Sequence, residues 1–519
     1  MRSRRIRTDA VAWWLTIAAL LLLRPCVAAA TAWPGETWTT ATDLTFLDPT
    51  GWAKNLSGAY WNPVTRRLWV CTNSPARFWS LREDGAGSFV IEHEYTGTGD
   101  LEGITQISTA TDRVFLIDEQ ARIIRSYRIS DGAALTTWFL STIPNWGNSG
   151  PEGIGFVPDA WLARSGFVDG SGNAYPQSVQ GADGFGGVVF IAVQTSGWVH
   201  AFDLKTDGTY AFVGRYLTSH NESCEITFDA SVGRMYILHN IDGNWLQVTD
   251  LTSSVSASDR RFNTAQEFQV PSGSNIEGFA VTPALTAAGT IGDDWCFFTD
   301  DDAANGALRW FKQLHPRLEK HARDGQAANC GSPVPVPPSV LASDPFSNPL
   351  PGFAVEFSVT SGGGSVAGGA ATTDSSGVAA VDSWTLGPLP GPNTLNAAGA
   401  DLSGSPVTFS ATGLVPPAAV PTGQAWAGGA RLDPPVPNPA RGETRISFAL
   451  RDEAPATVTV LDAGGRTVRT LVQATLAPGV HQAAWDGRRG DGTPAGPGIY
   501  FYCLHTAGQV LTRRGLLLR

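Results

Sequence analysis

The sequence predicts an all-β protein, a β-propeller followed by two β-sandwiches. A short element with an acidic residue and a glycine recurs through the first 300 residues, and an apolar strand with a polar end follows each copy. Glycine and proline are abundant (58 and 34 of 519 residues), only 16% of residues are charged, and no long stretch has the apolar period of a helix. Proline-rich stretches then separate two further segments of alternating apolar and polar residues.

Residues 1–32 have the composition of a secretory signal peptide. Four arginines in the first seven residues precede an apolar run over residues 10–23 and small residues at 28–32. The apolar run is shorter than the roughly 20 residues of a membrane span, and no later stretch is long and apolar enough. We therefore expect a secreted or cell-surface protein with no membrane span. The net charge of −11 argues against a nucleic acid as partner and favours cations or neutral ligands, so the expected partner is an unknown extracellular ligand.

The propeller is expected over residues 38–316, where the acidic-glycine element recurs at intervals of 45, 50, 73 and 52 residues. Most of these intervals are close to the roughly 40–50 residues of known propeller repeats. In three copies the third strand runs into an Asp-Gly pair, which is a strong signal for a hairpin turn. The five copies are Leu56-Ser57-Gly58, Leu101-Glu102-Gly103, Pro151-Glu152-Gly153, Cys224-Glu225-Ile226 and Ile276-Glu277-Gly278.

The ring of blades is expected to close through the N-terminal end of the domain. The fifth copy lacks an outer strand after Phe311, whereas a spare strand, residues 43–47, precedes the first copy. Pairing these two segments removes both free sheet edges, which otherwise promote aggregation. This register predicts five blades, with six as the alternative.

The acidic residues of the element are the candidate metal ligands. Each begins an innermost strand, so the four are predicted to converge at one end of the central channel. Four carboxylates at close range repel one another unless a cation, a proton or a basic group lies between them. Oxygen ligands without His or Cys favour a hard ion, so the expected cofactor is calcium. The alternatives are that each Glu accepts hydrogen bonds from backbone N–H groups of the next blade, or that it acts directly in catalysis. The four residues are Glu102, Glu152, Glu225 and Glu277.

A second polar set stands at the ends of the strands that follow the element. These side chains are candidates for ligand binding, although residues of these types also form turns at strand ends. The set consists of Asn73, Glu119, Gln194, Asn240 and Asp300.

Several of these stretches resemble a known family. Leu-Ser-Gly-Ala-Tyr-Trp-Asn-Pro at residues 56–63, Leu-Glu-Gly-Ile at 101–104 and Asn-Ile-Glu-Gly-Phe-Ala at 275–280 resemble the SdiA-regulated family of exported β-propellers. A looser likeness extends to phytase-like and strictosidine-synthase-like propellers. The resemblance implies a propeller whose central mouth holds a divalent cation, with no well-established reaction. Two departures are Ser57, which replaces the acid, and Ile226, which replaces the glycine.

Catalytic motifs are sparse. The sequence has no nucleophile elbow, no His-Glu-x-x-His and no phosphate-binding loop. His220 and His239 flank the fourth element, near Glu222 and Glu225, and are the candidate acid–base residues. With the phytase-like likeness, they make a metal-assisted phosphoester or ester hydrolase the alternative function. The leading expectation is a calcium-dependent binding protein without catalysis.

The rest of the chain is expected to space and anchor the propeller. A charged segment and a proline-rich linker occupy residues 317–338, and residues 339–413 resemble bacterial Ig-like domains of the invasin and intimin class. A second linker, residues 414–432, leads to a last domain over residues 433–519. Its Asn438-Pro439 opening and its Trp485-Asp486-Gly487 turn resemble the Ig-like domain of flagellar-hook-capping proteins and the C-terminal sorting domain of type IX secretion cargo. This resemblance implies the secretion machinery as a partner.

Overall fold

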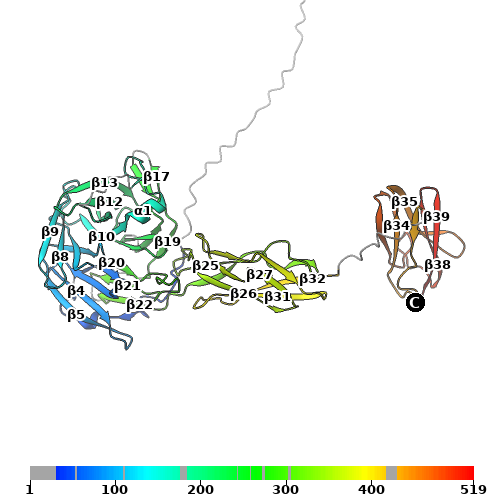
Figure 1. Ribbon diagram of the computed structural model, residues 1–519, viewed down its shortest axis with the longest axis horizontal. Helices are drawn as coiled ribbons and strands as arrows, with labels where there is room; N and C mark the ends of the chain where they lie inside the picture. The colour runs from blue at the N-terminus through cyan, green and yellow to red at the C-terminus, as the bar shows by residue number, and fades with distance from the viewer. Residues whose placement is uncertain are drawn as a thin grey trace, which may run out of the picture. The chain divides into compact units, whose positions relative to one another are not determined.

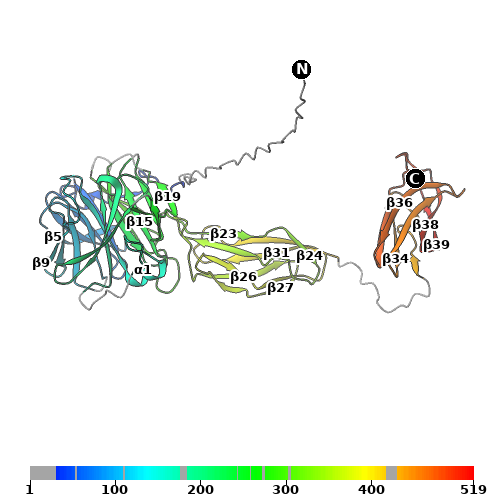
Figure 2. The same ribbon diagram turned by 90° about the horizontal axis from the view of Figure 1, so that it is seen from above.

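The computed structural model describes residues 31–52, 55–108, 111–175, 184–241, 243–256, 259–271, 275–301, 306–415 and 429–518. Most of the expected signal peptide and of the 414–432 linker lies outside these residues, as does part of the long insertion in the third repeat. The chain divides into two compact units, residues 1–415 and 416–519 (Figures 1 and 2). Within the described residues no helix is long and apolar enough to cross a membrane.

The first unit begins with a β-propeller, which confirms the predicted fold class. Among the described residues, five sheets each contain four antiparallel strands. In three of the sheets these strands are consecutive in the chain, and in the other two the outermost strand comes from elsewhere in the chain. The first two sheets are β2 (Leu56–Asn62), β3 (Arg67–Thr72), β4 (Arg77–Glu83), β5 (Phe89–Thr96), and β6 (Leu101–Thr105), β7 (Arg113–Asp118), β8 (Ile123–Arg128), β9 (Ala134–Phe139).

Of the remaining three sheets, the third carries a long insertion between its first two strands, and the fifth is completed by a strand from the N-terminal side of the domain. The third is β10 (Pro151–Pro158), β11 (Gly187–Val193), β12 (Trp198–Leu204) and β13 (Tyr210–Leu217), extended by β18 (Asp259–Phe262) and β17 (Ser253–Ser256). Helix α1 (Asp159–Ser165) lies in the insertion between β10 and β11. The fourth is β14 (Glu225–Asp229), β15 (Arg234–His239), β16 (Trp245–Thr249) and β19 (Gln266–Gln269); the fifth is β20 (Ile276–Val281), β21 (Cys296–Asp300), β22 (Leu308–Phe311) and β1 (Thr42–Asp43).

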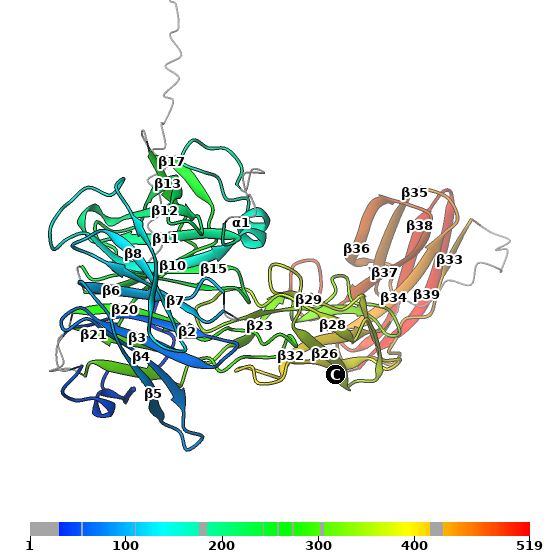
Figure 3. The ribbon, with the colours of Figure 1, turned by 60° about the vertical axis from the view of Figure 1, so that its left-hand side comes forward.

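The innermost strands form a closed ring. Strands β2, β6, β10, β14 and β20 contact one another in that order, and β20 contacts β2. Figure 3 labels β2, β6, β10 and β20 within the propeller. As the sequence predicted, a strand from the N-terminal side completes the last sheet, because β1 pairs with β22 through Thr42↔Trp310 and Asp43↔Arg309. The paired residues lie at the start of the predicted strand, and residues Thr45–Leu47 instead form a 3-10 turn.

The glycine of the acidic-glycine element is explained by the packing of the inner strands. In β2, β6, β10 and β20 the pairing register shifts at the element, which is the signature of a β-bulge. A Cβ at Gly103 would come within 2.6 Å of the Glu152 carbonyl oxygen, and one at Gly58 within 2.6 Å of the Gly103 Cα. The glycines therefore let neighbouring inner strands approach closely. Strand β14, whose element has Ile226 instead of glycine, pairs with β15 without a bulge.

The first sandwich follows directly and packs against the propeller. Its strands are β23 (Arg317–Ala322), β24 (Gln326–Asn329), β25 (Ser339–Ser343), β26 (Ala354–Ser361), β27 (Gly364–Ala367), β28 (Ala370–Thr372), β29 (Val378–Ala380), β30 (Ser383–Leu386), β31 (Gly391–Ala398) and β32 (Val407–Leu414). The predicted charged segment and linker at 317–338 require correction, because β23 pairs with β25 and β24 pairs with β32. The sandwich core includes Leu350 and Phe353, and it is continuous with Val232, Ala284 and Leu285 of the propeller.

The second unit is a separate β-sandwich. Its two sheets have the strand orders β33-β34-β37 and β36-β35-β38-β39, and its core includes Trp485 and Tyr502. The strands are β33 (Ala430–Leu432), β34 (Thr444–Leu450), β35 (Ala454–Leu461), β36 (Thr467–Leu476), β37 (Gly479–Trp485), β38 (Gly498–Thr506) and β39 (Gln509–Leu517).

Candidate functional site

The two predicted polar sets lie at the same end of the propeller. Antiparallel pairing places the start of each inner strand beside the end of the second strand, as in Leu101↔Asp118 and Ile276↔Asp300. Glu102 therefore starts its strand next to the end of β7, where Glu119 follows. We call this end the acidic mouth and define it by Asp100, Glu102, Glu119, Glu152 and Glu277.

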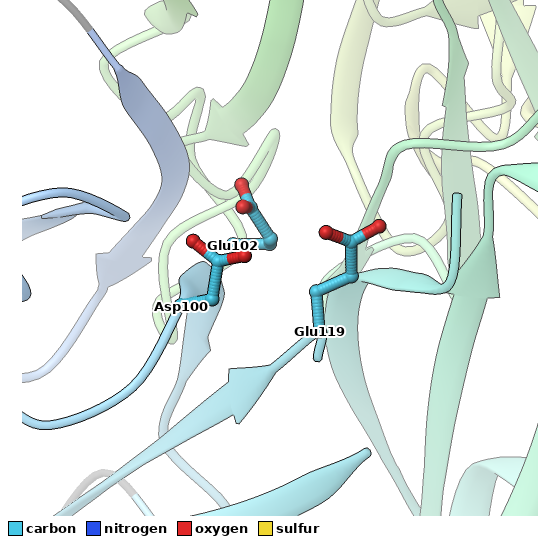
Figure 4. A group of neighbouring side chains, drawn as sticks. All are labelled: Asp100, Glu102 and Glu119. Carbon is cyan, nitrogen blue, oxygen red and sulfur yellow. The ribbon is translucent and has the colours of Figure 1, made fainter. Parts of the chain in front are cut away.

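Three carboxylates of the second sheet form the centre of the acidic mouth. Each of Asp100, Glu102 and Glu119 has an oxygen atom within 4.8 Å of the other two (Figure 4). Glu102 lies in β6, Asp100 immediately precedes that strand, and Glu119 immediately follows β7. Asp100 was not among the predicted site residues. Its spacing of two residues from Glu102, which places both on one side of an extended chain, is the signal that identifies it.

Hydrogen bonds orient this group. The Asn73 Nδ2 atom donates to Glu102 Oε1 at 3.2 Å, and the Gly150 backbone N–H donates to Glu119 Oε1 at 2.8 Å. Asn73 Oδ1 is buried and has no hydrogen-bond partner among the described residues. Asn73 and Glu119, both predicted from the ends of second strands, therefore belong to the acidic mouth.

Glu119 and Glu152 share a hydrogen bond between their carboxyl groups. Two carboxylates form such a bond only when one of them is protonated. Burial, together with the charges of Glu102, Glu277 and Glu119, raises the pKa of Glu152 well above its usual value, and the hydrogen bond to Glu119 acts in the same direction. This pair joins the second and third sheets across the mouth.

The other two glutamates of the mouth, Glu102 and Glu277, also have raised pKa values. Burial and the nearby charges of Asp100 and Glu119 raise the pKa of Glu102 to about 7. Burial and the charges of Asp301 and Glu102 raise the pKa of Glu277 well above its usual value. The Ser57 hydroxyl beside Glu102 and Glu277 opposes both shifts. Serine at this position thus supplies a donor where the repeat pattern would add another charge.

Glu225 has a different environment from the other three glutamates of the repeat. It is 1% exposed and accepts hydrogen bonds from the backbone N–H groups of Ala59 (3.1 Å), Ile154 (3.2 Å) and Ile226 (2.9 Å). These donors belong to the first, third and fourth sheets. Glu225 therefore links three blades across the ring. This is the alternative in which the glutamate accepts backbone hydrogen bonds from other blades, and we call it the Glu225 staple. Burial raises the pKa of its carboxyl, and the three donors oppose that shift.

The remaining residues of the second polar set occupy varied positions. The Asn240 side chain donates to Asn275, which in turn donates to Glu277 Oε1 at 2.8 Å. Gln194 precedes a 3-10 turn, and its side chain hydrogen-bonds to Glu222. Asp300 ends β21 and is buried, and its backbone N–H donates to Ala307. Asn240 therefore reaches the acidic mouth through Asn275, whereas Gln194 and Asp300 contact neighbouring loops.

The candidate acid–base histidines have structural partners. The His239 ring contacts the Glu222 carbonyl oxygen and, at 3.3 Å, Gln247 Oε1, and burial lowers its pKa to about 4. His220 pairs with Glu267 at 3.1 Å and stacks on Trp245. The hydrogen-bonding groups of both rings are thus engaged within the fourth sheet and the loop that precedes it.

Two family models match the chain. The SdiA-regulated model matches residues 38–160, and the FlgD Ig-like domain model matches residues 437–507. These matches confirm the resemblances to the SdiA-regulated family and to the Ig-like domain of flagellar-hook-capping proteins. No curated protein matches the sequence.

Solved structures with low sequence identity align with parts of the chain. A chain of the crystal structure of a nidogen/laminin complex is 13% identical, with a TM-score of 0.29, and the alignment covers 50% of this chain and 80% of that one. The D0-D1 domain of intimin is 12% identical, with a TM-score of 0.15, and the alignment covers 39% of this chain and 97% of that one.

Proposed function

We propose that this is an exported binding protein whose propeller holds a calcium ion at the acidic mouth and presents an extracellular ligand site there. The observation that carries the proposal is the convergence of Asp100, Glu102 and Glu119, with oxygen atoms within 4.8 Å of one another. The first sandwich then acts as a spacer. The C-terminal unit serves sorting and surface attachment through the secretion machinery, in line with its FlgD-like match.

The donor set of the acidic mouth suits calcium. Calcium takes six to eight oxygen ligands from carboxylates, amide oxygens and water in flexible geometry. The mouth offers the three clustered carboxylates and the unpartnered Asn73 Oδ1, with Glu152 and Glu277 near them. These residues include neither His nor Cys, which zinc prefers. A bound cation would also offset the repulsion that raises the pKa values of these carboxyls.

Calorimetry and thermal unfolding test the ion. Calcium added to the chelator-treated protein should release or absorb heat at a stoichiometry of one, and at about 100 times Kd it should stabilise the fold by about 2.7 kcal/mol. Glu102→Gln should abolish both effects. Glu94→Gln is the matched control, because Glu94 is exposed and pairs only with Arg77 at the surface of the first sheet. If the wild-type protein gives neither heat nor a thermal shift, the ion is excluded.

A metal-assisted phosphoester or ester hydrolase is the second candidate. The neighbouring carboxyls Glu119 and Glu152 and the raised pKa of Glu102 are the features that favour it, because acid–base catalysis uses carboxyls whose pKa values the environment has shifted. A screen with generic phosphoesters and esters, with and without calcium, distinguishes the two functions. An enzyme should turn over a substrate and lose activity in Glu102→Gln and Glu277→Gln, whereas a binding protein should show no turnover.

A further inference from the structure

The opposite end of the propeller contains a cavity of about 1150 Å³. It lies where the inner strands end and turn outward, whereas the acidic mouth lies where these strands begin. Its volume is slightly above the roughly 300–1,000 Å³ of typical small-molecule sites. Residues from all five inner strands line it, together with the loop over residues 283–293 and with Pro351 and Gly352 of the first sandwich.

The wall of this cavity is aromatic. Tyr60, Phe156 and Phe228 come from three different inner strands, and Phe185 comes from the insertion of the third repeat. All four are partly exposed, whereas most large apolar side chains of the inner strands and their neighbours are fully buried. Aromatic faces that line a hollow offer large apolar contact areas and geometrically specific stacking to a ligand.

The charged groups of the lining are already paired. Arg66 forms an ion pair with Asp293 at 2.6 Å and lies over the Trp61 ring at 5.8 Å. Asp229 accepts hydrogen bonds from the backbone N–H groups of Ser231 (2.7 Å) and Ala284 (2.9 Å). A charged ligand would therefore lose its hydration here without gaining a free counter-charge, which is costly.

The other polar side chains of the lining are neutral. Gln106 accepts a hydrogen bond from Asn62 at 2.6 Å and donates one to the Arg113 carbonyl oxygen at 3.1 Å, so its amide is engaged. Hydroxyl groups then make up most of the remaining polar lining, with Tyr60, Thr105 and Thr227 on the inner strands. They can position a ligand through one or two hydrogen bonds.

We propose that this cavity binds an uncharged, largely apolar small molecule that carries an aromatic ring. The ring stacks against Tyr60, Phe156 and Phe228, and the hydroxyls orient it. This site is separate from the acidic mouth, so its occupation does not depend on calcium.

A pair of fluorescent probes tests the proposal on the full chain. N-phenyl-1-naphthylamine is neutral and aromatic, and 1-anilinonaphthalene-8-sulfonate has the same ring system with a negative charge. The neutral probe should bind saturably at one per chain, equally with calcium or chelator, and at least tenfold more tightly than the sulfonate. Absence of saturable binding, or equal binding of both probes, overturns the proposal.

Variants locate the probe. Val281→Trp should fill the cavity and Phe228→Ala should remove part of its wall, so each should weaken binding at least tenfold. Phe139→Ala is the control, because Phe139 is 68% exposed on the outermost strand β9, and it should leave binding unchanged. Ser108→Trp, at an exposed lining position, gives a second filling variant if Val281→Trp does not fold. Binding that is unchanged in a folded filling variant overturns the proposal.

Discussion

Glu225 and Glu102 occupy equivalent positions in the repeat but have different roles. Glu102 hydrogen-bonds to Asn73 at the acidic mouth, whereas Glu225 accepts three backbone N–H groups inside the ring. The strand of Glu225 has no bulge, because its element lacks the glycine. A register change of one residue reverses the direction of a strand side chain, so the two carboxylates need not point the same way.

Removing the Glu225 staple should destabilise the propeller without changing its proposed calcium binding. In Glu225→Ala, three backbone N–H groups that lie in the ring lose their acceptor, and each buried unsatisfied donor costs about 1–3 kcal/mol. We expect a loss of roughly 3 kcal/mol or more in urea unfolding, and an unchanged heat of calcium binding per folded molecule. Glu94→Ala should cost less than about 1 kcal/mol, because its ion pair is exposed. Unchanged stability with lost calcium binding would make Glu225 a metal ligand.

Stability of the calcium-free protein should fall as the pH rises. The folded-state pKa of Glu102 is about 7, above the roughly 4.3 of an unfolded glutamate. A carboxyl with a raised pKa contributes stability below its unfolded pKa and loses it as the pH rises through the folded pKa. Thermal unfolding in chelator should therefore show declining stability from pH 5 to 8, by on the order of 1–3 kcal/mol for this group.

Glu102→Gln should flatten this pH dependence, because the amide carries no charge at any of these pH values. Calcium should restore the stability of the wild-type protein at pH 8. A wild-type profile that is flat or rises with pH in chelator would contradict the assignment.

The residues of the site could be predicted in part from the sequence. The period of the repeat and the polar ends of the strands identified Glu102, Glu119 and Asn73. Asp100 and Asn275 precede the strands, and no repeat pattern marks them. The role of Glu225 depends on the absence of a bulge, and the sequence gives only the missing glycine as a sign of it.

Single strands of the propeller depend on close backbone contacts that one methyl group would disturb. In Gly103→Ala, the new Cβ would lie 2.6 Å from the Glu152 carbonyl oxygen and 2.9 Å from the Gly153 Cα. Such overpacking costs about 1–3 kcal/mol. Urea unfolding of Gly103→Ala should show this loss.

Gly184→Ala is the matched control for this substitution. Its Cβ would meet its nearest neighbour, Asp203 Oδ1, at 3.5 Å, an ordinary contact. Its stability should stay within about 0.5 kcal/mol of the wild-type value. Equal stability of both variants would show that the ring can relax around the added methyl group.

At the scale of strands, the sequence was most informative where the repeat was regular. The second and third strands and the closing strand β1 agree with the alternation and turn signals. The charged residues at 317–323 and the prolines that follow them predict a segment outside the sandwich. In the structure it forms β23 and β24, and Leu318, which is 1% exposed, is the buried anchor of β23. Pairing with the distant strands β25 and β32 determines that this segment forms strands, and the local composition does not reveal that pairing.

At the scale of the molecule, the propeller and the first sandwich form one compact unit. Tyr236 of the propeller contacts Asn348 of the sandwich at 2.9 Å through its hydroxyl, and its ring packs on Phe346. The shared core also joins Leu285 and Phe353. The independent-module arrangement that a linker at 317–338 would give therefore does not hold.

Truncation should separate the two units of the chain. A protein that ends at residue 415 should keep the thermal transition of the propeller, because residues 416–519 form their own compact unit. A protein that ends at residue 316 exposes the shared core and should unfold at a markedly lower temperature or aggregate. Equal melting temperatures for the two truncations would contradict the shared core.

The closure of the ring has a consequence for how the propeller folds. Strand β1 is synthesised first, yet its partner β22 begins after a further 264 residues. The blades between them can each pair locally, but the circle is completed only when the two distant ends of the domain meet. Contacts this far apart in sequence slow folding, because the chain loses entropy before they form. The nascent domain therefore keeps two unpaired sheet edges until Phe311 is available, so a chain that is interrupted before this residue leaves both edges open to pairing with other chains.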